Sequence, residues 1–390
     1  MKICRSRKNI DIILSVTKRN AVLIVVVVGV VIIAGGVFLA KSGDGFLAYH
    51  SLLNWFNRDG TPTQTPATQN PPCSLNPKPR EFNREPYYTG TLIDAHVHMP
   101  VSSSIVSAVA KRIGFENAPY FTGTLTTDYL ICLFESEGIA KTFGFFMTTR
   151  FSSRQELNTA KKFEKIYPGK IAQFYMPAPY TTLRITPEAV RETLDKNKGL
   201  FKGIGEIKDF ENAGLDNPYF SELYRIASDY NLIVMMHPFR NHKEVTEKIL
   251  SDYPKVNFLL HGGDDEEWIM EVIKNHKNVY YSVDADLVSL YGWERRHVEK
   301  KPGKEDWLSY VRANFDTMLE RKLRDWQERI EAYPDRFMWG TDRWYDWHFS
   351  EEVGGLIEEF GRVFIGRLPL SVQKKFAYEN AERLISGTGR

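Results

Sequence analysis

Six side chains able to bind a metal ion follow apolar, strand-like runs of the sequence. In chain order they are His96 and His98 after LID, Glu206 in GIGE, His237 after LIVMM, His261 after VNFLL, and Asp342 after FMWGT. Imidazole nitrogens and carboxylate oxygens are ligands that proteins offer to zinc and to similar divalent ions. Four of the nine histidines of the chain belong to this set. The sequence therefore predicts a site for a divalent metal ion, with zinc as the expected one, where the strands end.

A divalent ion at this site would supply hydrolytic chemistry. Such an ion lowers the pKa of bound water from about 15.7 to about 7, and it polarises the carbonyl or phosphoryl group under attack. Asp342 is the candidate general base, and His261, if it is not a metal ligand, can stabilise or protonate the developing charge. The chain has no GxSxG elbow, no P-loop and no GxGxxG after a strand, so the sequence offers no rival mechanism.

The elements that must position these side chains alternate between strand and helix from Thr89 onward. Apolar runs of strand length end near His98, Thr148, Pro177, Glu206, His237, His261, Asp284 and Asp342. Amphipathic segments follow most of these runs, at 126–137, 186–197, 218–230, 243–252 and 266–276. Thr126 and Thr186 are candidate N-caps of two of them. Strands separated by helices pair in parallel, and eight such units predict a TIM-like (β/α)8 barrel with its catalytic groups at the C-terminal strand ends.

Two connections are longer than the others. One is the loop 99–125 after the first strand, and the other is a helical insertion from about residue 305 to about residue 333. Both follow strand ends at the face where the catalytic groups are expected, so the sequence predicts that they form a lid there.

The N-terminal region predicts a membrane protein. Residues 21–40 are apolar or small and carry no charge, and they are long enough to cross a bilayer as a helix. The preceding residues 1–20 are basic, so the positive-inside rule predicts a cytoplasmic tail there and an extracytoplasmic catalytic domain. A cleaved signal peptide is the alternative, although its apolar region usually spans only about 7 to 15 residues. Residues 41–88 are predicted to be an extended linker and residues 89–390 to be the barrel.

Composition limits the partners of the chain. Its 390 residues include 51 basic and 49 acidic ones, so no nucleic-acid partner is expected, whereas a small-molecule substrate and a homo-oligomer are compatible with the sequence. The three cysteines have no CxxC spacing and cannot form a sulfur-rich metal site. A disulfide between Cys73 and Cys132 is allowed if both lie in an oxidising compartment.

The motifs DAHVH, GIGEI, MMHP, LLHGG and WGTDRW, in this order, resemble the amidohydrolase superfamily, and within it the amidohydrolase-related (amidohydrolase 2) branch. The resemblance covers about residues 92–386, and YENAERLIS with Asn380 is similar to the closing helix of the family. It implies a TIM-like barrel that carries one or two divalent ions. The implied ligands come from the HxH of strand one, the histidines of strands five and six, and the aspartate of strand eight.

Carried over to this chain, the resemblance implies that His96, His98, His237 and Asp342 hold the metal of members with a single ion. In members with two ions, His261 would bind the second ion and Glu206 would bridge the pair. The glutamate of GIGEI is also similar to that of the TatD-like nucleases and phosphatases, which favours two ions. In members that resemble decarboxylases, His261 would instead act on the water or the substrate.

Substrate-binding candidates surround these positions in the sequence. Arg150 ends the second predicted strand, Arg240 follows His237, and Arg343 and Trp344 follow Asp342. Guanidinium groups hold carboxylates or phosphates, although a surface or loop-bracing role is the commoner one for any single arginine. Asp284 is interpreted as structural, and His348 as an exposed loop residue.

Several functions are compatible with these motifs. The favoured one is a membrane-anchored, metal-dependent hydrolase acting on an amide, ester, lactone or related bond of a small molecule. A decarboxylase on the same barrel is the second, with the arginines holding the acid. A TatD-like nuclease or phosphoesterase and a non-catalytic binding protein are further alternatives; the near-neutral charge opposes the nuclease and the complete ligand set opposes the binding protein.

Overall fold

The computed structural model describes residues 73, 75–102, 120–122, 124–262, 267–284 and 303–387. These residues belong to one compact unit, Pro72–Arg390. The predicted tail 1–20, the predicted anchor 21–40 and most of the predicted linker lie outside the described residues. No helix among the residues described has the length and apolar character needed to cross a membrane.

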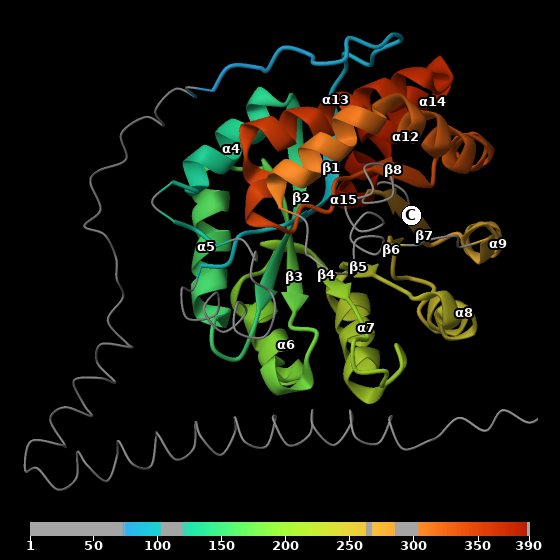
Figure 1. Ribbon diagram of the computed structural model, residues 1–390. Helices are drawn as coiled ribbons and strands as arrows, with labels where there is room; N and C mark the ends of the chain where they lie inside the picture. The colour runs from blue at the N-terminus through green and yellow to red at the C-terminus, as the bar shows by residue number, and fades with distance from the viewer. Residues whose placement is uncertain are drawn as a thin grey trace, which may run out of the picture. The chain divides into compact units, whose positions relative to one another are not determined.

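Eight parallel strands form one sheet in which each strand pairs with the next along the chain (Figure 1). Their bounds are β1 Leu92–His98, β2 Ile139–Thr148, β3 Ile171–Pro177, β4 Phe201–Ile207, β5 Ile233–Met236, β6 Phe258–Leu260, β7 Val279–Val283 and β8 Phe337–Trp339. The residues that follow β8 bridge back to β1, where the Asp342 backbone N–H donates to the His96 carbonyl at 2.8 Å. The sheet is thus a nearly closed barrel, and the predicted TIM-like architecture is confirmed.

Helices follow the strands and form an outer layer. The described ones are α4 Thr127–Ser136, α5 Ser153–Ile166, α6 Pro187–Lys196, α7 Pro218–Tyr230, α8 Lys243–Asp252, α9 Glu267–Asn275, α12 Lys304–Ala332, α13 Glu351–Arg367, α14 Leu370–Lys374 and α15 Asn380–Ser386. Short turns of other helix types are η1 Thr181–Leu183, η2 Arg240–His242, η3 Asp346–Phe349 and η4 Lys375–Glu379. The predicted caps are present, because Thr126 accepts from the Tyr129 N–H at 3.1 Å and Thr186 from the Ala189 N–H at 3.3 Å. Each such cap contributes about 1 kcal/mol.

The long helix α12 is part of the outer layer. Its apolar residues recur at helical spacing, and Trp326 stacks on Tyr281 of β7 while Phe315 meets Phe360 of α13, each pair with ring centroids 5.1 Å apart. Figure 1 shows α12 alongside α13. The prediction that this insertion forms a lid is wrong, because its apolar face is already buried against the barrel. The central part of the other insertion, residues 103–119, lies outside the described residues.

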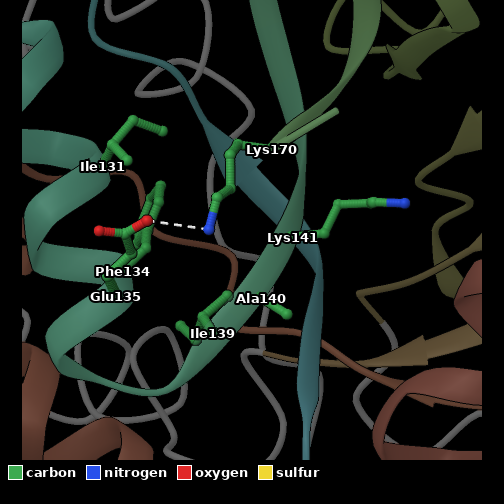
Figure 2. A pocket seen from close by; sticks show the side chains of 7 residues that line it. All are labelled: Ile131, Phe134, Glu135, Ile139, Ala140, Lys141 and Lys170. Atoms are coloured by element: carbon green, nitrogen blue, oxygen red, sulfur yellow. Dashed lines mark ion pairs between the residues drawn. The ribbon is translucent and has the colours of Figure 1, made fainter. Parts of the chain in front are cut away.

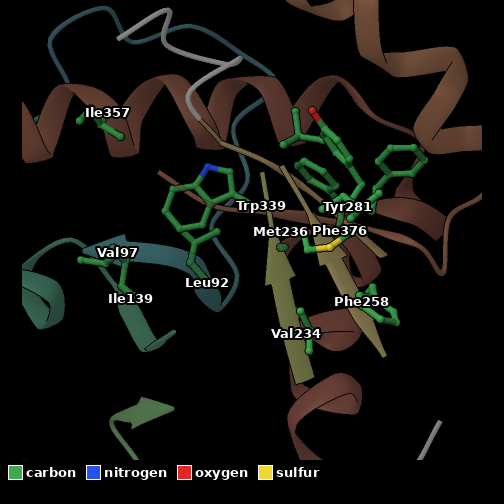
Figure 3. Packing of buried hydrophobic residues seen from close by; sticks show 14 of the residues in the cluster. Leu92, Val97, Ile139, Val234, Met236, Phe258, Tyr281, Trp339, Ile357 and Phe376 are labelled. Carbon is green, nitrogen blue, oxygen red and sulfur yellow. The ribbon is translucent and has the colours of Figure 1, made fainter. Parts of the chain in front are cut away.

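Apolar side chains form one layer inside the barrel and one outside it, since alternate residues of a strand point to opposite faces of the sheet. The inner layer contains Ile93, Ala95, Phe143, Phe145, Ala172, Phe174, Met176, Ile233, Met235, Leu259, Tyr280 and Met338. The outer layer lies between strands and helices, and Figure 3 shows Trp339 in it together with Leu92 of β1 and Ile357 of α13. These layers hold the strand ends, and hence the polar side chains on them, at fixed positions.

The closing helix α15 is tied to the start of β8. The side-chain amide of Asn380 donates to the backbone carbonyls of Pro334 and Phe337 at 2.8 and 2.6 Å. Arg383 in turn donates to the Asn380 side-chain oxygen at 2.8 Å. The asparagine and the basic residue singled out in YENAERLIS therefore fasten the last helix to the barrel.

The last part of the predicted linker packs on the barrel. Glu359 of α13 accepts hydrogen bonds from the backbone N–H groups of residues 81–83 at 2.6, 2.9 and 3.0 Å. The Phe82 ring stacks on Phe315 of α12 with centroids 4.0 Å apart. The prediction of an extended linker up to residue 88 is therefore wrong for residues 75–88. Local composition could not show this, because the partners lie more than two hundred residues later in the chain.

Cys73 and Cys132 form a disulfide. The bond joins the segment before the barrel to the middle of α4, and it spans a sequence separation of 59 residues. The pairing that the sequence allowed is thus present in the structure.

Candidate metal centre

All six predicted ligands lie together at the C-terminal end of the barrel, which we call the mouth. His96 and His98 end β1, Glu206 lies near the end of β4, and His237, His261 and Asp342 follow β5, β6 and β8. With Asp284, which follows β7, they form three overlapping groups whose ligand atoms lie within 4.8 Å of one another. The groups are His96, His261, Asp284 and Asp342; His96, His98 and Glu206; and Glu206, His237 and His261. The fold therefore assembles one continuous cluster from six different strands.

Several polar atoms of this cluster are buried without a hydrogen-bond partner among the described residues. They are Nε2 of His96, both ring nitrogens of His98, Oε2 of Glu206, Nδ1 of His261 and Oδ1 of Asp342. A buried polar atom that lacks a partner costs about 1 to 3 kcal/mol. Imidazole nitrogens and carboxylate oxygens that converge in this way can all be satisfied by one kind of partner, a metal cation. The residues present thus fit a divalent ion.

The two histidines of β1 point to the same side, as their spacing predicted. Their ring centroids are 4.8 Å apart. The pairing of β1 with β2 shifts register between Asp94 and Val97, so simple alternation does not hold through this part of the strand. This irregularity changes the direction in which the following side chains point, and it lies where the strand carries both imidazoles; bulges next to active sites often have this effect.

Asp94 joins the ends of β1 and β8. Its carboxylate accepts from the backbone N–H groups of His96 and Thr341 at 3.1 and 2.9 Å and from the Thr341 hydroxyl at 2.7 Å. Burial raises the pKa of Asp94 to about 7. These three bonds fix the two chain segments that carry His96 and Asp342.

Two glycines leave room for the ligands. At Gly205, where φ is +132°, a Cβ would lie 2.3 Å from the Met235 carbonyl oxygen of β5. At Gly262, where φ is +80°, a Cβ would lie 2.3 Å from Cε1 of His237. Positive φ and close approach both favour glycine, so the glycines of GIGE and HGG position Glu206 and His237.

Asp284 is a member of the cluster that the sequence interpretation assigned to a structural role. Its Oδ2 lies 3.0 Å from Nδ1 of His96 and 3.4 Å from Nδ1 of His261. A carboxylate on the second ring nitrogen fixes the tautomer of a metal-binding histidine and strengthens it as a ligand. The only signal in the sequence is an aspartate directly after the apolar run of β7, and the same signal identified Asp342.

The charges within the cluster are distributed unevenly. Burial lowers the pKa of both His98 and His237 to about 3, which leaves these imidazoles neutral as metal binding requires. Burial also opposes the charged form of His261, but the carboxylates of Glu206 and Asp284 outweigh it and raise the pKa of His261 to about 10. Without an ion, His261 is therefore the protonated member of the cluster, and it donates its Nε2–H to Glu206.

Asp342 is the predicted general base. Burial raises its pKa to about 6, close to the range in which a base works best at neutral pH. Its Oδ1 lies 3.1 Å from Nε2 of His98 and 3.5 Å from Nε2 of His96. A carboxylate among neutral imidazoles can hold both an ion and the proton of an attacking water.

Lys208 is a second residue that the sequence interpretation missed. Its Nζ lies 2.8 Å from Oε1 of Glu206, and its side chain is 10% exposed. The ammonium group and the protonated His261 together hold the pKa of Glu206 well below its usual value, although burial opposes this. A lysine two residues after the glutamate of GIGEIK was the available signal.

The four substrate-binding candidates lie in different surroundings in the structure. Trp344 lies beside the cluster, with its ring centroid 4.6 Å from that of His98. Arg150 is exposed and stacks over Phe151 at 4.9 Å, and the side chain of Arg240 lies outside the described residues. Arg343 is fully buried and donates from both terminal nitrogens to Glu137 at 3.1 and 2.6 Å. Both terminal nitrogens of its guanidinium group are occupied by this ion pair, so Arg343 has a structural role and is not a substrate ligand.

His348 is buried and not an exposed loop residue as the sequence suggested. Its Nδ1 accepts from the backbone N–H groups of Trp344 and Tyr345 at 3.0 and 3.3 Å. It therefore shapes the chain segment that follows Asp342.

A surface hollow near the opposite end of the barrel is not part of the centre. It is lined by Ile131, Phe134 and Glu135 of α4, by the first residues of β2 (139–141), and by Lys170, which pairs with Glu135 at 2.8 Å (Figure 2). In such barrels catalytic groups gather at the C-terminal strand ends, and the hollow lies at the strand starts.

Comparison with known proteins gives the family. The sequence matches the family model described as amidohydrolase over residues 93–386. No protein of curated function matches it. Among solved structures, an amidohydrolase from Burkholderia multivorans with bound zinc shares 14% identity, covers 76% of this chain and 99% of its own, and has a TM-score of 0.50. A 5-carboxyvanillate decarboxylase from Novosphingobium aromaticivorans complexed with manganese shares 16%, covers 76% and 96%, and has a TM-score of 0.46.

A dihydroorotase from Campylobacter jejuni shares 13% identity with this chain, covers 76% of it and 83% of its own length, and has a TM-score of 0.43. At these identities a structural likeness concerns the fold alone. The family model, in contrast, covers nearly the whole barrel, from β1 to α15. The chain belongs to the amidohydrolase family.

Proposed function

We propose that the chain is a metal-dependent hydrolase that cleaves an amide, ester, lactone or related bond of a small molecule. The observation that carries this proposal is the buried cluster of four imidazoles and three carboxylates at the barrel mouth. When bound there, a divalent ion supplies acidification of a water molecule and polarisation of the bond under attack. Asp342 takes up the proton of that water and returns it to the leaving group.

The arrangement of the ligand groups favours two ions. Glu206 belongs both to the group with His96 and His98 and to the group with His237 and His261. A carboxylate has two oxygens and can serve two ions at once. In this proposal Glu206 would be shared by the two positions. His96, His98 and Asp342 would complete one position, and His237 and His261 would complete the other.

Zinc is the metal that we propose. Sites rich in imidazole with a few carboxylates suit zinc, whereas magnesium and calcium prefer oxygen ligands throughout. The Burkholderia multivorans amidohydrolase was solved with bound zinc.

A decarboxylase is the second candidate, and His261 is the observation that favours it. His261 lies between the carboxylates of Glu206 and Asp284, which raise the pKa of its ring and favour the protonated, proton-donating form in the absence of a second ion. A decarboxylase needs such a group to protonate the carbon that loses carbon dioxide. In this alternative His96, His98, His237 and Asp342 would hold a single ion and His261 would remain a catalytic acid.

We also propose that residues 21–40 anchor the chain in a membrane with the barrel outside the cytoplasm. The uncharged apolar run supports the anchor, and the disulfide between Cys73 and Cys132 supports an oxidising compartment. Deletion of residues 1–40 should release the chain from the membrane fraction, and retention of the shortened chain there would contradict the anchor.

The function can be tested with a panel of small esters, lactones, amides and aromatic acids. The full-length chain in mild detergent should hydrolyse at least one substrate class, lose activity on removal of metal, and regain it with zinc. His96→Ala should lose activity at least about 100-fold, because it removes a ligand. His276→Ala, at the end of α9 and outside the cluster, should retain it. Hydrolysis that survives both metal removal and His96→Ala would refute the proposal.

A further inference from the structure

A row of aromatic rings borders the metal cluster on the side of β3, β4 and β5. Phe239, two residues after His237, has its ring centroid 5.2 Å from that imidazole. Phe210 lies next in the row, 6.4 Å from Phe239, and Tyr180 stacks on Phe210 at 5.8 Å with the planes 28° apart. Flat rings in such a row offer their faces and edges to another planar group.

Phe210 is exposed to solvent, although hydrogen bonds fix the residues on either side of it. Phe210 is 42% exposed. Three large apolar residues are exposed among the described residues, and two of them, Phe151 and Phe210, follow strand ends at the mouth. Exposure of a large ring to water is unfavourable, so packing of a ligand against Phe210 would be favourable in free energy.

Polar braces fix the loop that carries Phe210. On one side of it, the carboxylate of Asp209 accepts from the backbone N–H groups of Ala213 and Gly214 at 2.9 and 2.7 Å. On the other side, Glu211 accepts from the Thr181 N–H at 3.1 Å, which joins the loops that follow β3 and β4. The ring is therefore pre-positioned, and little ordering entropy is lost when a ligand packs against it.

Lys208 connects this row of rings to the metal cluster. Its ammonium lies 2.8 Å from Oε1 of Glu206 and 5.6 Å from the centroid of the Phe210 ring. An ammonium has three N–H donors, and the pair with Glu206 uses one of them. A positive charge between a flat apolar surface and the reaction centre suits a ligand that is planar and carries a negative charge near its reacting end.

We propose that Lys208, Phe210 and Phe239 form a subsite for a planar, ring-containing carboxylate, with Lys208 binding the carboxylate and the phenylalanines binding the ring. The inference rests on the proposed function, because it places the reacting bond of the substrate at the metal cluster. It adds to that function a substrate class, ring-containing anions, and a specificity-determining residue, Lys208.

Isophthalate binding to the full-length chain, measured by calorimetry, tests the subsite. Isophthalamide keeps the ring but has no charge, and glutarate keeps two carboxylates but has no ring. Lys208→Met should weaken isophthalate binding about 10-fold or more and leave isophthalamide unchanged, because a charge-assisted hydrogen bond is lost. Phe210→Ala should weaken both ring compounds about 5-fold and leave glutarate unchanged. Lys208→Arg should restore most of the isophthalate affinity.

Lys202→Met is the matched control, since Lys202 is an exposed lysine near the start of β4, the strand that Lys208 follows. The isophthalate affinity of this variant should equal that of the wild type. Phe210→Ala alters an exposed side chain and keeps the test valid if Lys208→Met fails to fold. The subsite would be overturned if isophthalate did not bind the wild type. It would also be overturned if isophthalate bound Lys208→Met and Phe210→Ala as tightly as the wild type.

Metal content measured on the same samples, with zinc and after chelation, separates the two claims. Zinc bound without any dependence of isophthalate affinity on Lys208 and Phe210 would overturn the subsite and leave the metal centre standing. Affinity that depends on both residues in a chain that binds no zinc would support the subsite and overturn the proposed hydrolase.

Discussion

At the scale of single residues, the sequence identified most of the candidate centre. His96, His98, Glu206, His237, His261 and Asp342 were recognised because each is a potential ligand at the end of a strand-like run, and the structure brings all six together. Lys208 and Asp284 were not assigned to the centre, because a lysine and an aspartate in such places are common on protein surfaces. Only the folded barrel shows that Lys208 contacts Glu206 and that Asp284 contacts two histidines. The roles of all these residues stay predictions.

Asp284 provides a prediction at this scale. Asp284→Asn keeps the shape of the side chain but removes the charge that orients His96 and His261, so zinc affinity should fall about 10-fold to 100-fold. Competition with a chromogenic chelator measures the affinity. Asp229→Asn, on α7 and away from the cluster, should bind zinc as the wild type does. Unchanged affinity in Asp284→Asn would show that the carboxylate does not support the ligands.

At the scale of elements, strand ends were predictable and long insertions were not. The observed ends of the eight strands lie within three residues of the predicted ones, because apolar runs and polar ligands mark them in the sequence. The role of α12 was not predictable, since an amphipathic pattern shows that a helix is covered on one face but not what covers it. Neither was the register shift in β1, which depends on pairing with β2.

Glu156 of α5 provides a prediction about pH. Its carboxylate accepts from the backbone N–H and the hydroxyl of Ser102, at 2.8 and 3.1 Å, and so fastens the loop after β1. Burial raises the pKa of Glu156 from 4.5 to about 7, so the folded chain binds this proton more tightly than the unfolded chain does. The resulting stabilisation is complete below about pH 4.5 and is lost as the pH rises to about 7, by an amount of about 3 kcal/mol.

Glu156→Gln cannot ionise and should not show this loss. Urea unfolding at pH 5 and pH 8 should therefore give a smaller decrease in the free energy of unfolding for Glu156→Gln than for the wild type. Glu164→Gln changes an exposed glutamate of the same helix and should follow the wild type. An identical decrease in Glu156→Gln and the wild type would contradict the assignment of a tightly held proton to Glu156.

At the scale of the whole molecule, the folded unit that contains the barrel begins earlier than the composition suggested. Residues 75–88 read as a linker because they are rich in proline and polar residues, yet they pack on α12 and α13, and Cys73 is bonded to α4. A segment with so few apolar residues is held by partners far away in the sequence, which no local pattern shows. The barrel is thus fastened to the chain that leads toward the proposed anchor.

Loss of the disulfide should lower stability. Bonding residues 59 positions apart restricts the unfolded chain, which in the chain-entropy model corresponds to about 4 kcal/mol. Cys73→Ser should lower the free energy of unfolding by up to this amount, and dithiothreitol should destabilise the wild type but not the variant. Cys4→Ser should behave as the wild type. Equal stability of Cys73→Ser and the wild type under oxidising conditions would show that the bond does not hold the segment.

The central claim is that the buried cluster is a metal centre in which Glu206 is shared by two ions. Elemental mass spectrometry on the full-length chain, purified without chelators, tests it most directly when the wild type and His261→Ala are compared. The account predicts about two ions per wild-type chain and about one in His261→Ala. One ion that is unaffected by the substitution would contradict the shared site and favour the decarboxylase, and a chain without bound metal would contradict the centre itself.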